Sequence, residues 1–174
     1  MIEFISMSSE GFAGRPAPVT SEEFRRAAGR FATGVAIATV LDAGGAPHGL
    51  TVSSFTSVSL SPPLVSICLG HAVSLIDTFR ESKYFGINIL SESQREFSER
   101  FARKGHDRFQ GVPWTPGETG VPLIDAVLAA IECRVEQRIP AGDHDIFVGL
   151  MVASRATEGM PLLHFAGAYR KLQS

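Results

Sequence analysis

The stretch TVSSFTSVSLS, residues 51–61, carries a hydroxyl group on seven of its eleven residues and contains no charge. The uncharged region is longer still, because no Asp, Glu, Lys or Arg occurs from residue 43 to residue 76. Protein surfaces normally carry many charges, so this region is either buried or reserved for a ligand. Serine and threonine hydroxyls together with backbone N–H groups suit a polar planar ring and a phosphate. The alternative is a half-buried strand whose hydroxyls bond to neighbouring carbonyl groups.

The apolar alternation within this stretch is interrupted. Leu50 and Val52 are two residues apart, but Phe55 follows three residues after Val52. An odd step reverses the face of a strand unless the chain bulges or turns there. We therefore predict a kink at Ser53 and Ser54, which turns hydroxyls and backbone N–H groups away from the ladder of the sheet.

A second group of small polar residues lies in LGHAVSLIDT, residues 69–78, where a predicted strand passes into a predicted helix. The N-terminus of a helix attracts anions through its free N–H groups and its dipole. We therefore expect Gly70, Ser74 and Thr78 to lie where a phosphate can bind.

A third group lies in GDHDIFVGL, residues 142–150, where Asp143, His144 and Asp145 come directly before an apolar strand. An imidazole at the foot of a hairpin can orient a planar ring or donate a hydrogen bond to it. Gly-Asp is also ordinary turn chemistry, so these residues alone leave a turn and a site equally open.

Motifs that would indicate other chemistry are absent. The sequence has no G-x-G-x-x-G, G-x-x-x-x-G-K-[ST], H-E-x-x-H or G-x-S-x-G pattern, which argues against common nucleotide-binding loops, zinc proteases and serine hydrolases. The five histidines, at positions 48, 71, 106, 144 and 164, lack metal-ligand spacing, so no metal site is predicted. Cys68 and Cys133 lie far apart in apolar runs, and we expect buried thiols in a reducing cytoplasm.

The elements that would position these groups are mainly strands. Apolar patterns and turn residues predict a hairpin of 34–42 and 47–53, followed by strands at 64–70, 84–90, 128–139, 144–157, 161–165 and 166–172. Two helices begin with capping boxes, Thr20 with Glu23 and Ser91 with Gln94, and a short helix is expected within 72–82. The Gly- and Pro-rich segment 104–122 predicts a long functional or mobile loop.

Few helices and no β-α-β-α alternation predict a single mainly β domain, a β-barrel with flanking helices. We expect residues 1–19 to form a flexible N-terminal tail and residues 20–174 to form the domain. The 174 residues, 44% hydrophobic and 20% charged, describe a soluble globular protein. The net charge of −2 gives no indication of binding to nucleic acid or an anionic membrane. No apolar run approaches the roughly 20 residues of a membrane span, and the N-terminus lacks signal-peptide features, so a cytoplasmic location is expected.

Several stretches occur in a recognisable order: GRFATGVAIAT, HGLTVSSFTSVSLSPPLVSICL, YFGINIL, GDHDIFVG and PLLHFAGAY. From about residue 22 to residue 172 this series resembles the short-chain NAD(P)H:flavin reductases, the small partners of two-component flavin-dependent monooxygenases. The resemblance implies the FMN-binding split β-barrel and a homodimer that binds FMN or FAD near the subunit interface. It also implies a separate monooxygenase that receives the reduced flavin.

The resemblance further implies roles for individual residues. The isoalloxazine ring would be lined or approached by Thr51, Val52, Ser53, Ser54, Thr33 and Gly34. The phosphate side of the flavin would be formed by Gly70, His71 and Ser74. The flavin would be flanked by Phe101 and Ala102, with the retained Tyr169 also in the site. His144 would meet the nicotinamide and position it for catalysis.

The C-terminal segment departs from the family pattern. Many relatives carry an aromatic residue at position 164 and basic residues near 166 and 168, where this sequence has His164, Ala166 and Ala168. Loss of the basic residues favours NADH over NADPH as the reductant.

The activity implied by the resemblance is hydride transfer from nicotinamide C4 to flavin N5. An uncharged hydroxyl-rich cradle suits a flavin that binds at about micromolar affinity and must leave again. Two alternatives stay open: a non-catalytic flavin-binding or electron-carrier protein on the same barrel, and an enzyme whose bound flavin passes electrons to iron or a quinone.

Overall fold

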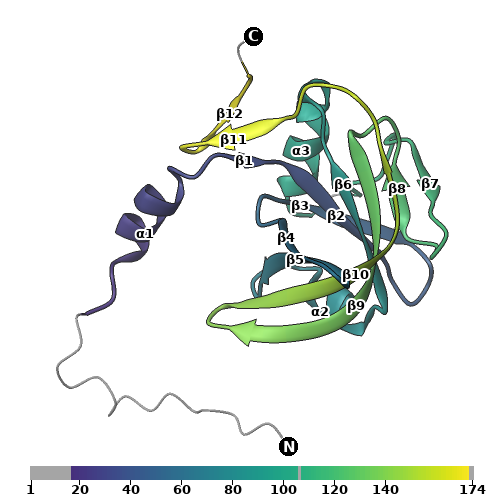
Figure 1. Ribbon diagram of the computed structural model, residues 1–174, viewed down its shortest axis with the longest axis horizontal. Coiled ribbons are helices and arrows are strands. Elements are labelled where there is room, and N and C mark those ends of the chain that lie inside the picture. Colours follow the sequence, from purple (N-terminus) through teal and green to yellow (C-terminus); the bar gives the residue numbers. More distant parts are fainter. Residues whose placement is uncertain (1–16, 106, 173–174) are drawn as a thin grey trace, which may run out of the picture.

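A curled antiparallel sheet dominates the computed structural model, which describes residues 17–105 and 107–172 (Figure 1). Most of the expected N-terminal tail lies outside these residues. The helices are α1 (Ser21–Ala28), α2 (Ile76–Glu81), the 3₁₀ turn η2 (Glu92–Gln94) and α3 (Arg95–Ala102). The strands are β1 (Thr33–Gly34), β2 (Ala36–Leu41), β3 (Pro47–Val52), β4 (Thr56–Leu60), β5 (Pro63–Gly70), β6 (Tyr84–Ile89), β7 (Trp114–Pro116), β8 (Pro122–Ile124), β9 (Ala129–Ala141), β10 (His144–Ala156), β11 (Leu163–Phe165) and β12 (Ala168–Arg170).

The main sheet has seven strands in the order β3-β2-β6-β9-β10-β5-β4, and every neighbouring pair is antiparallel. β3 and β4 are at opposite edges of this sheet, although only residues 53–55 separate them in the chain. The sheet must therefore curl until its two edges nearly meet. The expected mainly β domain with few helices is confirmed.

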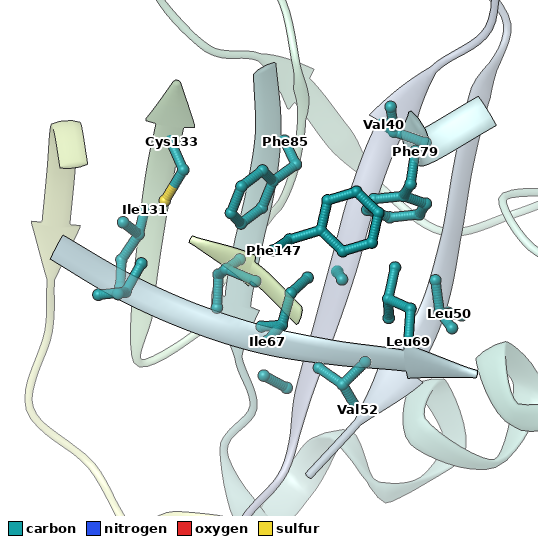
Figure 2. Packing of buried hydrophobic residues seen from close by; sticks show 14 of the residues in the cluster. Val40, Leu50, Val52, Ile67, Leu69, Phe79, Phe85, Ile131, Cys133 and Phe147 are labelled. Carbon is teal, nitrogen blue, oxygen red and sulfur yellow. The ribbon is translucent and has the colours of Figure 1, made fainter. Parts of the chain in front are cut away.

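The inside of the curl is filled by one apolar cluster. Its residues come from six strands of the main sheet and from α2, and Figure 2 shows Phe85 and Phe147 near its centre. Phe147 meets Phe79 of α2 edge to face, with ring centroids 6.1 Å apart. α2 thus closes one end of the curled sheet.

A second apolar cluster covers part of the outer face of the sheet. β2 contributes to both clusters because its alternate residues face opposite sides, Val40 towards the first and Ile37 towards the second. The segment 104–122, for which a functional or mobile loop is predicted, contributes three buried apolar residues to this cluster: Phe109, Val112 and Val121. The sequence did not predict that these residues are buried, because the Gly and Pro residues between them interrupt any regular apolar spacing.

Both predicted capping boxes are present. The N–H of Thr20 donates to Oε2 of Glu23 at 2.9 Å, and the N–H of Ser91 donates to the side-chain oxygen of Gln94 at 3.0 Å. The apolar face of α1 is nevertheless uncovered, since Phe24 is 63% exposed. Figure 1 shows α1 standing away from the sheet. No helix among the described residues is long and apolar enough to cross a bilayer.

Asn88 of β6 joins three segments at the outer cluster. Its Nδ2 donates to the carbonyl of Ile37 at 3.2 Å, and its Oδ1 accepts from the N–H of Ile124 at 2.7 Å.

The substitution Asn88→Ala leaves the backbone N–H of the buried residue Ile124 without an acceptor, which costs about 1–3 kcal/mol. We expect the free energy of unfolding in urea to fall by about that amount, whereas Thr115→Ala, on an exposed position of β7, should leave it unchanged. An unaltered urea midpoint for Asn88→Ala would contradict this role.

Candidate functional site

The predicted kink is present between β3 and β4. The side chain of Val52 points into the inner cluster, and Ser53 directly after it is exposed. Among the described residues, the backbone N–H groups of Ser53, Ser54 and Phe55 have no hydrogen-bond acceptor. These three donors lie outside the sheet ladder and can be offered to a ligand.

The hydroxyls of this stretch are only partly available. Thr51 Oγ1 donates to the carbonyl of Ser98 at 2.6 Å. Ser54 Oγ donates to the carbonyl of Cys68 at 3.1 Å and accepts from its N–H at 3.0 Å. Ser54 therefore holds the kink against β5. Its hydroxyl bonds to a neighbouring carbonyl, as predicted by the alternative in which this stretch is a half-buried strand. Ser53 keeps a free hydroxyl within the described part of the chain.

The C-terminal hairpin reaches the same region through α3. Tyr169 Oη lies 2.8 Å from Oγ of Ser98, the residue whose carbonyl binds Thr51. His164 pairs with Thr33 across β1 and β11 and with Tyr169 across β11 and β12. Strand pairing and hydrogen bonds thus connect Thr33, Tyr169 and Thr51. Sequence reasoning missed Ser98, whose position on the buried side of α3 was its only signal.

Two predicted contacts need correction. The ring of Phe101 is fully buried and meets Phe109 edge to face at 5.0 Å, so it supports the site from behind and cannot flank a bound ring. The side chain of Val52 is likewise in the core, which leaves only its backbone for a ligand. Ala102, at the end of α3, is exposed. Apolar spacing on a helix is the same for a core face and for a ligand-binding face, which explains the error at Phe101.

The other side of the kink leads to the hairpin of β9 and β10. His144 pairs with Gly70 of β5, and a Cβ atom on Gly70 would lie 3.4 Å from Nε2 of His144. Because Gly70 has no side chain, the imidazole of His144 can pack directly against the backbone of β5. Nδ1 of His144 lies 2.7 Å from Oδ1 of Asp143, and this contact lowers the pKa of the Asp143 carboxyl.

The three residues expected near a phosphate lie around the turn from β5 to α2. Gly70 faces His144, whereas Ser74 lines a cavity of about 640 Å³ beside His48 and Trp114. Thr78 lines a different cavity, and α2 has no side-chain cap at its N-terminus. Gly70, Ser74 and Thr78 therefore do not line one common cavity in this structure. A turn separates the end of β5 from α2.

Replacing the two serines of the kink should affect the free energy of unfolding differently. Ser54→Ala removes both hydrogen bonds to Cys68 and should lower the free energy of unfolding by about 1 kcal/mol. Ser53→Ala removes an exposed hydroxyl and should change it by less than about 0.5 kcal/mol. Urea unfolding of the two variants is the measurement, and equal losses of stability would contradict the placement of Ser54.

Comparisons with known proteins show the family of the chain. The family described as "Flavin reductase like domain" matches residues 28–173. A Rhizobium meliloti protein named "Probable flavin reductase" is 45% identical over 129 residues, which are 74% of this chain and 42% of that protein. The chain therefore spans less than half the length of that relative.

Two further relatives match over nearly their full length. The "FMN reductase (NADH) SmoA" of Agrobacterium fabrum is 39% identical over 97% of this chain and 95% of its own. The solved structure of a Streptomyces globisporus NADH:FAD oxidoreductase, in complex with NAD and FAD fragments, has a TM-score of 0.81. It is 35% identical and covers 90% of this chain and 98% of its own. On these matches, the chain belongs to the flavin reductase-like family.

Proposed function

We propose that the chain reduces FMN or FAD with NADH and releases the reduced flavin to a separate monooxygenase. The observation that carries the proposal is the kink at residues 53–55, which offers three backbone N–H groups between the Tyr169 side and the His144 side. Relatives named for NADH-dependent reduction of FMN or FAD support the same activity. The absence of basic residues at Ala166 and Ala168 favours NADH.

The donor groups present fit a flavin. The isoalloxazine ring has several acceptor atoms along one edge, and neutral N–H groups held by a rigid kink suit them better than mobile charged side chains. Ser54 fixes the backbone through Cys68, so Ser53 and the N–H groups keep their positions. Gly34 adds open space near Thr33, since a Cβ atom there would meet nothing within 4 Å. Hydride transfer from nicotinamide C4 to flavin N5 is the chemistry that the two bound cofactors supply.

His144 is placed to orient the nicotinamide. A carboxylate only accepts hydrogen bonds, so Nδ1 of His144 donates to Asp143. This fixes the ring and leaves Nε2, which lies beside Gly70, without a hydrogen bond among the described residues. The chain needs no nucleophile of its own, because its task is to stack the two rings and exclude water.

A homodimer of split-barrel subunits would complete the site. Large apolar side chains are exposed on the edge strand β4, where Leu60 is 96% exposed, and on α1, where Phe24 is 63% exposed. Uncovered apolar surface of this kind marks interfaces. A second copy covering β4 and α1 would also enclose the open side of the kink. We place this assembly in the cytoplasm.

The activity has a direct test. The purified chain should oxidise NADH rapidly only when free FMN or FAD is added, which absorbance at the nicotinamide band measures. Tightly bound stoichiometric flavin with negligible turnover would instead indicate an electron carrier.

His144→Ala removes one hydrogen bond to the nicotinamide and should raise the KM for NADH about tenfold, with a smaller change in the KM for flavin. An unchanged KM for NADH would remove His144 from this role.

The dimer is tested by a charge on β4. Leu60→Asp places a carboxylate on the exposed apolar edge and should shift the protein from dimer to monomer in analytical ultracentrifugation. Leu172→Asp, on another exposed leucine at the C-terminal end, is the matched control and should leave the dimer intact. A wild-type protein that sediments as an 18.7 kDa monomer would contradict the assembly.

A further inference from the structure

One edge of β3 carries backbone groups that the sheet does not use. Among the described residues β3 pairs only with β2, and the N–H of Asp42 donates to the carbonyl of Ala46 at 3.0 Å where this hairpin turns. In an antiparallel pair, hydrogen-bonded and non-hydrogen-bonded positions alternate along the strand. The N–H and C=O groups of Gly49 and Thr51 therefore point away from β2. This free edge of β3 runs directly into the kink at residues 53–55.

Arg108 is held against the free edge of β3. Its Nη1 donates to the carbonyl of Gly49 at 2.6 Å, and its Nε donates to the carbonyl of Arg103 at 2.9 Å. These contacts fix the plane of the guanidinium and leave Nη2 without an acceptor among the described residues. Burial lowers the pKa of this half-buried guanidinium, and no carboxylate of the described chain opposes that effect. Such an arginine is suited to an anionic ligand, above all a phosphate.

A cavity of about 640 Å³ opens beside Arg108. It lies between the tip of the β2–β3 hairpin, the residues just before α2 and the start of β7, and its walls include His48, Ser74 and Trp114. This volume is in the range of small-molecule sites and is far larger than one phosphate requires. The indole of Trp114, which meets Phe109 edge to face at 5.9 Å, gives the cavity an aromatic wall.

The other ionisable side chains at this cavity already have partners. Nε2 of His48 lies 2.9 Å from Oδ2 of Asp42, and Oδ1 of Asp107 accepts from the N–H of Phe109 at 3.0 Å. Among the described residues that line the cavity, Arg108 is thus the charged residue with donors left for a ligand.

The length of the free edge suits a flavin nucleotide. Gly49 and Ser53 are four residues apart on extended chain, which corresponds to about 13 Å. A flavin whose ring is bound at Ser53 can lay its ribityl chain along Thr51 and bring its phosphate to the guanidinium at Gly49. An adenosine attached beyond that phosphate would then enter the cavity beside Trp114.

We propose that Arg108 binds the phosphate of the flavin nucleotide and that the cavity beside Trp114 receives the adenosine half of FAD. The inference rests on the proposed function and adds its substrate preference: FAD binds more tightly than FMN, and FMN more tightly than riboflavin. Of the residues that the resemblance assigns to the phosphate side, Gly70, His71 and Ser74, only Ser74 lines this cavity. The adenosine diphosphate of NADH has the same chemistry as that of FAD, so the test has to separate the two.

Equilibrium titrations with oxidised flavins test the phosphate contact without turnover. Isothermal titration calorimetry gives the dissociation constants of riboflavin, FMN and FAD for the wild-type chain and each variant. Arg108→Gln should raise the dissociation constant for FMN about tenfold or more, the effect of one lost hydrogen bond between charged groups. Riboflavin has no phosphate, so its dissociation constant should stay unchanged, which also shows that the variant is folded.

The adenosine contact is tested at Trp114. Trp114→Leu should raise the dissociation constant for FAD about tenfold, the effect of one lost stacking contact, with little change for FMN. The matched control is Arg155→Gln. Arg155 also donates to a backbone carbonyl, that of Ile124 at 3.4 Å, but it does not line this cavity. The control should keep the wild-type dissociation constants for all three flavins.

The outcomes separate this inference from the proposed function. Equal wild-type dissociation constants for riboflavin, FMN and FAD overturn the inference, and this result depends on no variant. An Arg108→Gln protein that loses as much affinity for riboflavin as for FMN overturns it too. So does a raised KM for NADH in Arg108→Gln with an unchanged dissociation constant for FMN, because the phosphate bound there is then that of NADH. A wild-type chain that binds FAD in preference to riboflavin but oxidises no NADH overturns the proposed function and leaves the flavin preference standing.

Discussion

The structure depends on one constraint: the two edge strands of a seven-stranded antiparallel sheet are joined by only three residues. β3 ends at Val52 and β4 begins at Thr56 on the far edge, so the sheet has to curl around its apolar interior. The residues that make this crossing cannot take part in either ladder. Their N–H groups are left without partners among the described residues, and this is the feature on which a flavin site can be built.

Rigidity at the crossing comes from its neighbours on both sides. Thr51 is tied to Ser98 and through it to Tyr169, and Ser54 is tied to the backbone of Cys68. Beyond Cys68, β5 leads to Gly70 and His144. The hydroxyl groups of residues 51–61 therefore have two roles. Some hold the backbone in place, and Ser53 with the freed N–H groups is left for binding.

Local patterns predicted much of the fold. The capping boxes at Thr20 and Ser91, the hairpin of β2 and β3, and the kink at Ser53 each depend on neighbouring residues, which the sequence displays directly. What failed depends on contacts between distant segments. The ring of Phe101 has the spacing of a binding face but packs on Phe109, and Ser54 looks like Ser53 until Cys68 is placed beside it. The Asp145–Arg80 contact joins residues 65 positions apart, so no local pattern could predict it.

We propose that the kink at residues 53–55 binds the flavin ring, and a crystal structure of the protein with FMN or FAD would test this. We expect acceptor atoms of the isoalloxazine to lie about 3 Å from the backbone N–H groups of Ser53, Ser54 or Phe55, with the open face of the ring turned towards His144. A ring bound elsewhere, for example in the cavity beside Trp114, would show that the kink is not the flavin site.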